Sequence, residues 1–128
     1  ASGSAADIPV YDFSTHLRTD RVRRVEPSAF VIVEGLFSLF WDDVRALLDT
    51  KVFIDVPHDV CLARRIERDT RHRGRPRDEV IRRYDTMARP KYDQYVLPSR
   101  MHADVIVDGT RPVDESVERI LGIIGNNA

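Results

Sequence analysis

The sequence of 128 residues lacks several features that would place it outside ordinary globular proteins. It has one cysteine, Cys61, which excludes an internal disulfide. Its longest purely apolar run, Ala29–Val33, is far shorter than the roughly 20 residues that a membrane-spanning helix needs. The N-terminus has no basic segment followed by an apolar stretch, so no export signal is visible. We therefore expect a protein of a reducing cytoplasm.

The sequence also lacks the phosphate-binding loop Gly-x-x-x-x-Gly-Lys-Ser/Thr, known as the Walker A motif. Its two lysines, Lys51 and Lys91, follow Thr50 and Pro90 rather than a glycine. Residues 1–7 are small and polar, a composition typical of a linker or a cloning junction. We expect them to lie outside the fold and residues 8–128 to form one domain.

Charge is balanced overall but unevenly distributed. The composition is 42% hydrophobic and 32% charged, as in globular proteins. The net charge of −1 argues against general attraction to nucleic acid. Residues 64–83, however, contain nine arginines and four acidic residues. Arginine can bind phosphate through two parallel hydrogen bonds, so this stretch is a candidate site for an anion.

Hydrophobic periodicity predicts alternating strands and helices. Short apolar runs predict strands at residues 30–34, 51–56 and 103–108, and helical spacing predicts helices at 42–49, 59–72, 77–95 and 113–124. We expect Pro90 to kink the long helix or to mark a boundary, and residues 8–24 to be irregular. The alternation predicts an α/β fold with a parallel sheet flanked by helices. Three strands are few for such a sheet, so the chain resembles part of one.

Glu34 is a candidate metal ligand. It follows four apolar residues at the predicted end of a buried strand, with Gly35 after it. A carboxylate in that position suits Mg²⁺, which prefers oxygen ligands. Acidic residues at strand ends are also common where no metal binds, and the pattern alone leaves both interpretations open.

The segment from Arg64 to Arg75 is the second candidate. On a helix Arg64 and Arg68 share a face, and Gly74 would let Arg73 and Arg75 move in as a lid. Converging arginines suit the charge on a transferring phosphoryl group.

An exposed helix face offers another explanation for these arginines. Its local ion pairs would be Arg65 with Asp69, Glu67 with Arg71, and Asp69 with Arg73. Nucleic-acid binding is a third explanation, disfavoured because no aromatic residues are interleaved between positions 64 and 83.

The third candidate is a cluster near the N-terminus. Tyr11, Phe13 and His16 lie in a segment without helical or strand periodicity. Aromatic faces can stack on a planar base, and an imidazole can hydrogen-bond to its edge. A small hydrophobic anchor with a surface histidine is the alternative.

Taken in order, these motifs resemble the uridine kinase (uridine-cytidine kinase) family of P-loop kinases over nearly all of residues 8–124. The matching motifs are Pro9-Val10-Tyr11-Asp12-Phe13 with His16, Val31-Ile32-Val33-Glu34-Gly35, Arg64-Arg65-Ile66-Glu67-Arg68-Asp69 with Arg73-Gly74-Arg75, Arg89-Pro90, and Ala103-Asp104-Val105-Ile106-Val107. The resemblance implies ATP-dependent phosphoryl transfer to the 5′-hydroxyl of uridine or cytidine with Mg²⁺. It also implies a three-layer P-loop kinase-like architecture, here without the first strand and phosphate loop.

The resemblance also implies roles for individual residues. Tyr11, Phe13 and His16 correspond to positions that line the pyrimidine pocket, and Glu34 corresponds to the acid that serves Mg²⁺. The catalytic positions are Arg65, Arg68, Arg73 and Arg75, of which Arg65 and Arg75 also bind substrate. Arg83 stands where the family commonly has glutamine, and the family's general base precedes the matched region, so no base is assigned.

Two alternatives to a truncated nucleoside kinase stay open. One is a natural split or degenerate relative that binds without catalysing. The other is a related P-loop kinase with a different small acceptor, as in phosphoribulokinase or pantothenate kinase. The expected partners are small nucleosides and nucleotides, and we expect binding to neither nucleic acid nor a membrane. The resemblance also implies that the protein forms a homo-oligomer.

Overall fold

The computed structural model describes residues 3–12, 15 and 17–126. Phe13 and His16, two of the residues expected to bind the base, lie outside the described residues. The chain divides into two compact units, Ala1–Val33 and Glu34–Ala128. Each unit is described by itself below.

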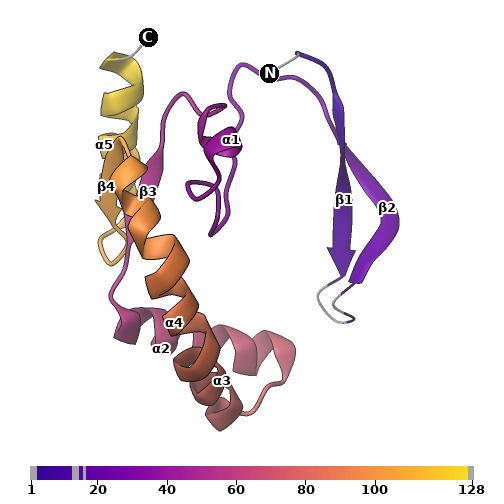
Figure 1. Ribbon diagram of the computed structural model, residues 1–128, viewed down its shortest axis with the longest axis vertical. Coiled ribbons are helices and arrows are strands. Elements are labelled where there is room, and N and C mark those ends of the chain that lie inside the picture. Colours follow the sequence, from indigo (N-terminus) through magenta and orange to yellow (C-terminus); the bar gives the residue numbers. More distant parts are fainter. Residues whose placement is uncertain (1–2, 13–14, 16, 127–128) are drawn as a thin grey trace. The chain divides into compact units, whose positions relative to one another are not determined.

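The first unit is a β-hairpin. Strand β1 (Ala6–Asp12) pairs antiparallel with strand β2 (Leu17–Val25) (Figure 1). The Thr19 hydroxyl supports the pairing by donating a 2.8 Å hydrogen bond to the Val10 carbonyl. The expectation of an irregular segment at residues 8–24 was wrong. Strand β1 begins at Ala6, within the range that the sequence assigned to a linker.

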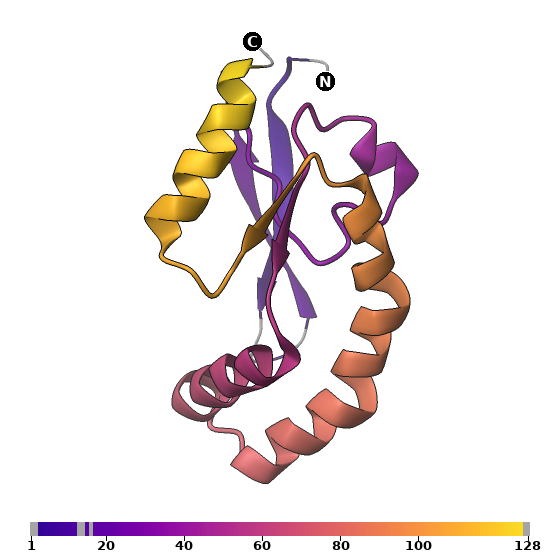
Figure 2. The same cartoon turned by 90° about the vertical axis from the view of Figure 1, so that its left-hand side faces the viewer.

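The second unit contains a parallel pair of strands. Strand β3 (Val52–Asp55) lies beside strand β4 (Val105–Asp108), with Val52 opposite Val105 and Asp55 opposite Asp108. Helix α5 (Val113–Asn126) packs against β4, as Figures 1 and 2 show. The predicted α/β class, a small parallel sheet flanked by helices, is confirmed.

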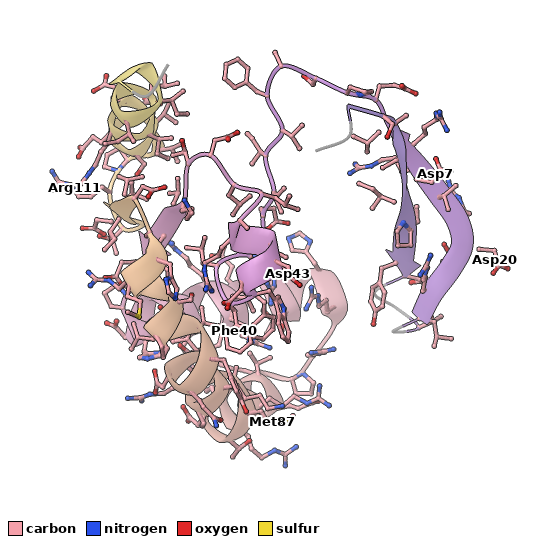
Figure 3. All side chains as sticks on the ribbon, turned by 45° about the horizontal axis from the view of Figure 1, so that its top comes forward. Asp7, Asp20, Phe40, Asp43, Met87 and Arg111 are labelled. Carbon is pink, nitrogen blue, oxygen red and sulfur yellow. The ribbon has the colours of Figure 1, made fainter. Side chains whose placement is uncertain are left out.

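The core lies on both faces of this pair of strands. Phe53 and Ile106 are neighbours in the register and pack with Leu39 and Val96 on one face. Phe40, labelled in Figure 3, extends this layer through an edge-to-face contact with Tyr95, the ring centroids being 5.9 Å apart. Because side chains alternate along a strand, the buried Val105 and Val107 point to the other face. Packing on this second face therefore covers β4, against which α5 lies, and leaves Ile54 of β3 exposed.

Two helices of the second unit precede the long helical run. Helix α1 (Asp42–Arg45) is shorter than the predicted segment 42–49. Helix α2 (His58–Arg73) agrees with the prediction to within one residue at each end. It stops at Gly74, whose φ of 60° is left-handed, a conformation that glycine adopts without steric cost.

The predicted helix at 77–95 is a composite, visible as one bent run in Figure 2. Its parts are α3 (Arg77–Arg83), the π-helix η1 (Tyr84–Ala88), α4 (Arg89–Lys91), the π-helix η2 (Tyr92–Val96) and the 3₁₀-helix η3 (Leu97–His102). Each π-turn adds a residue and so rotates the side chains that follow. Val80, which precedes the π-turns, is 1% exposed, whereas Met87 in η1, labelled in Figure 3, is 54% exposed. Regular helical spacing would place Val80, Tyr84, Met87 and Tyr95 near one apolar face, and this expectation was wrong because Met87 is exposed.

The strand predicted at residues 30–34 is also absent from the structure. These residues have no regular structure and are exposed, including the apolar side chains from Phe30 to Val33. A strand forms only where a neighbouring backbone accepts and donates its hydrogen bonds. In the part of the chain that the structure describes, β3 and β4 pair only with each other, and no strand pairs with residues 30–34.

Candidate functional site

The carboxyl ends of the two parallel strands meet at one edge of the sheet. Asp55 ends β3 and Asp108 ends β4, side by side in the register. An open cavity of about 420 Å³ lies here, lined by Asp55, Pro57, Ile106, Asp108, Thr110 and Arg119. Ligands of α/β folds bind beyond this edge of the sheet. The sequence assigned no role to Asp55, and it did not indicate that Arg119 lines this cavity.

The loop after β4 is held close to this edge. The backbone N–H of Gly109 donates to the Asp55 carbonyl at 2.8 Å. A β-carbon at Gly109 would approach side-chain methyls of Val56 and Ile54 to 2.5 and 2.7 Å, so only glycine fits without a shift. From helix α2, the Arg64 guanidinium donates to the Gly109 carbonyl at 2.9 Å. This bond ties α2 to the loop beside the cavity.

Asp108 shapes the same loop through its own side chain. Its carboxylate accepts hydrogen bonds from the Thr110 hydroxyl at 2.6 Å and from the Thr110 N–H at 2.8 Å. These two bonds favour the charged form and lower the pKa of Asp108 from its ordinary value. Asp108 is thus a negative charge fixed at the rim of the cavity.

The start of α2 is anchored by a histidine that the sequence analysis did not single out. His58 Nδ1 lies 2.8 Å from the hydroxyl of Tyr84, and Nε2 lies 3.1 Å from the Asp93 carboxylate. The Tyr84 hydroxyl also lies 3.2 Å from the His58 carbonyl, to which it can donate. Burial raises the pKa of Tyr84. The cluster fastens α2 to η1 and η2, and no short motif around His58 signals it.

Asp69 is the centre of the candidate site. Its side chain is 1% exposed, yet it carries a charge. The Arg68 Nε donates to Asp69 Oδ1 at 2.8 Å, and Arg73 Nη1 lies 3.3 Å from the same oxygen. Arg65 Nε and Arg75 Nη1 each lie 3.8 Å from Oδ2. The four arginines that the sequence predicted to be catalytic therefore converge on one carboxylate.

The cluster has more positive charge and more donors than Asp69 can satisfy. Four guanidiniums and one carboxylate leave three positive charges in excess. Each arginine has five N–H donors, whereas a carboxylate offers about four acceptor sites. The arginine side chains are between 20% and 50% exposed, so solvent and ligands can reach them. Converging guanidinium groups of this kind can bind an anion with several oxygens.

The local ion pairs weighed as an alternative are present as well. Arg65 and Arg73 both pair with Asp69, and Arg71 Nη1 lies 2.8 Å from the Glu67 carboxylate. The Glu67–Arg71 pair is largely exposed and lies apart from the Asp69 contacts. The helix thus carries a solvated pair and a convergent cluster.

The acidity of Asp69 predicts how stability depends on pH. Burial disfavours its charged form, but the hydrogen bond from Arg68 and the neighbouring guanidinium charges outweigh burial, so the pKa lies below the ordinary value of 3.8. A lowered folded-state pKa stabilises the protein above the ordinary value, and this contribution is lost as pH falls through the folded-state pKa. We therefore compare the free energy of unfolding of the unmodified protein with that of the Asp69→Asn variant. The difference between the two should be constant near neutral pH and become smaller in acid. Urea unfolding from about pH 7 to about pH 3 measures this difference, and a difference independent of pH would contradict it.

Tyr11, Glu34 and Arg83 belong to other segments of the described chain. Tyr11 is in β1 of the first unit, where it is exposed and pairs with Arg18. Glu34 is exposed at the start of the second unit. Arg83 pairs with Glu79 at 3.2 Å. Among the described residues there is no group of three or more potential metal-ligating side chains, and no helix there is long and apolar enough to span a membrane.

Comparisons with known proteins agree with the resemblance. The profile described as "Phosphoribulokinase / Uridine kinase family" matches residues 1–116. A uridine kinase of Streptococcus uberis is 44% identical over 105 residues, which cover 82% of this chain and 50% of that protein. A uridine kinase of Tolumonas auensis is 42% identical over 106 residues, 83% of this chain and 50% of that protein. One of Staphylococcus aureus is 38% identical over 106 residues, 83% of this chain and 51% of that protein. The chain spans about half the length of the curated relatives it matches.

Proposed function

Because the chain belongs to the phosphoribulokinase / uridine kinase family, we propose that the full-length protein transfers a phosphoryl group from ATP to the 5′-hydroxyl of uridine or cytidine. The observation that carries this proposal is the convergence of four arginines on the buried Asp69. In this proposal the chain supplies the part of the kinase that holds phosphates and acceptor.

The arginines would act by electrostatic stabilisation. Negative charge spreads over the equatorial oxygens of a phosphoryl group during transfer, and fixed cations around it lower the barrier. Guanidinium groups suit this role because their planar forks match pairs of phosphate oxygens and stay charged at any working pH. Arg65, Arg68, Arg73 and Arg75 are the proposed catalytic residues, and Arg65 and Arg75 also contact the nucleoside or its phosphates.

We assign the residues that would bind the pyrimidine and the metal ion by their positions in the sequence. We assign Tyr11, Phe13 and His16 to the pyrimidine, whose flat ring suits stacking and edge hydrogen bonds. Glu34 would hold Mg²⁺, which neutralises phosphate charge. One exposed carboxylate fits this ion because Mg²⁺ keeps several waters and is completed by substrate phosphates rather than by an all-protein cage.

A radiolabelled-ATP assay on the full-length protein tests the proposal. The expected result is Mg²⁺-dependent transfer of label to uridine or cytidine. Ribulose 5-phosphate serves as the competing acceptor, because the family description also includes phosphoribulokinase. Label on ribulose 5-phosphate alone, or on no acceptor, would overturn the proposal.

A further inference from the structure

We propose that Asp69 is a positioning residue, whose carboxylate arranges four arginines into one phosphate-binding receptor. The proposal rests on the proposed function and adds a residue whose role is to hold the cations rather than to touch the substrate. Its basis is the placement of a buried carboxylate at the point where the arginines meet.

Each oxygen of the Asp69 carboxylate contacts two of the four arginines. Oδ1 faces Arg68 and Arg73, and Oδ2 faces Arg65 and Arg75. Three of these arginines belong to α2, and Arg75 belongs to the chain after Gly74. One side chain thereby joins the rigid helix to the segment that follows it.

The backbone of Asp69 holds the residues after α2 close to the helix. Its carbonyl accepts hydrogen bonds from the N–H groups of Gly74 and Arg75, the latter at 3.1 Å. The left-handed turn at Gly74 therefore returns Arg75 toward the helix that it has just left. An Asp69→Asn substitution keeps this carbonyl, so it tests the carboxylate alone.

Electrostatic repulsion explains why the four arginines require a nearby negative charge to stay close together. Four like charges at short range repel one another and would spread into solvent. The carboxylate offsets this repulsion, yet it leaves the cluster three charges positive. The cations are thus held together before an anion arrives, and binding does not have to order them.

Positioning and simple charge make opposite predictions for one variant. Asp69→Asn removes a negative charge beside the receptor, so attraction alone would tighten the binding of an anion. If Asp69 positions the arginines, the same substitution weakens binding although the site becomes more positive. The sign of the change separates the two explanations.

The experiment is calorimetric titration of the full-length protein with inorganic tripolyphosphate. We expect Asp69→Asn to bind at least about tenfold more weakly than the unmodified protein. Glu67→Gln is the matched control, because it removes an equal charge from the same helix at a carboxylate that pairs with Arg71. That control should bind as tightly as the unmodified protein or slightly more tightly.

Asp69→Glu covers the case in which Asp69→Asn does not fold. It keeps the charge but moves the carboxylate by one methylene, so we expect a folded protein with weaker binding and a lower kcat. Equal or tighter binding by the folded variants overturns the proposal, as does an unmodified protein that does not bind tripolyphosphate. A protein that binds it in the expected order but phosphorylates no nucleoside would leave Asp69 in its role and refute the proposed function.

Discussion

In a full-length protein with the proposed kinase activity, we expect Arg68→Ala to lower kcat/KM for nucleoside phosphorylation by about 100-fold or more. Arg68 makes the shortest contact with Asp69, at 2.8 Å, and its side chain is 50% exposed. A cation fixed beside a transferring phosphoryl group contributes on this scale, since removal of one preorganised donor typically costs about 10²–10³ in rate. Steady-state kinetics with ATP and uridine measure the loss.

Arg71→Ala is the matched control for Arg68→Ala. Arg71 lies on the same helix three residues further on, but its partner is the exposed Glu67. We expect kcat/KM to change less than about threefold, because an exposed pair contributes little. Equal losses in the two variants would show that helix stability, rather than the cluster, explains the effect.

Replacing Phe53 with alanine destabilises the protein by about 3–5 kcal/mol. Phe53 is 6% exposed at the centre of the core and packs against Leu39 and Val96. Its loss leaves a cavity between β3 and the helical run, so transfer and cavity terms add. Urea unfolding at neutral pH measures the change.

The neighbouring Ile54 provides the comparison for Phe53. Ile54 lies on the opposite face of β3 and is 63% exposed. Ile54→Ala should cost less than about 1 kcal/mol, because little apolar surface returns to water. A larger cost for Ile54 than for Phe53 would contradict the difference in burial between these two residues of β3.

Strands β3 and β4 and helix α2 were predictable because their signals are local. Short apolar runs marked β3 and β4, and the spacing of apolar residues together with Gly74 marked α2. The hairpin β1–β2 was missed because β2 is dominated by arginines and has little apolar alternation. It forms through backbone pairing between exposed strands, which side-chain hydrophobicity does not report.

The candidate site was predictable in its members but not in its centre. Helical spacing grouped Arg64 with Arg68, and only the family resemblance gave Arg65 a role beside Arg68, Arg73 and Arg75. In the structure Arg65 contacts Asp69, whereas Arg64 donates to the Gly109 carbonyl. The sequence offered Asp69 only as a partner in two helical pairs. Burial of Asp69 and its contact with Arg75 depend on the turn at Gly74, which no spacing rule encodes. The His58 cluster likewise joins elements that lie far apart in the sequence.

Nuclear magnetic resonance of the arginine Nε–H groups tests directly whether the arginines around Asp69 bind phosphate. Spectra of the full-length protein with and without Mg²⁺-ATP report which guanidiniums meet the phosphates, with signals assigned by single substitution. We expect the signals of Arg65, Arg68, Arg73 and Arg75 to shift together, while that of Arg71 does not. Unchanged signals from these four, or an equal shift of Arg71, would contradict the assignment of the Asp69-centred cluster as a phosphate site.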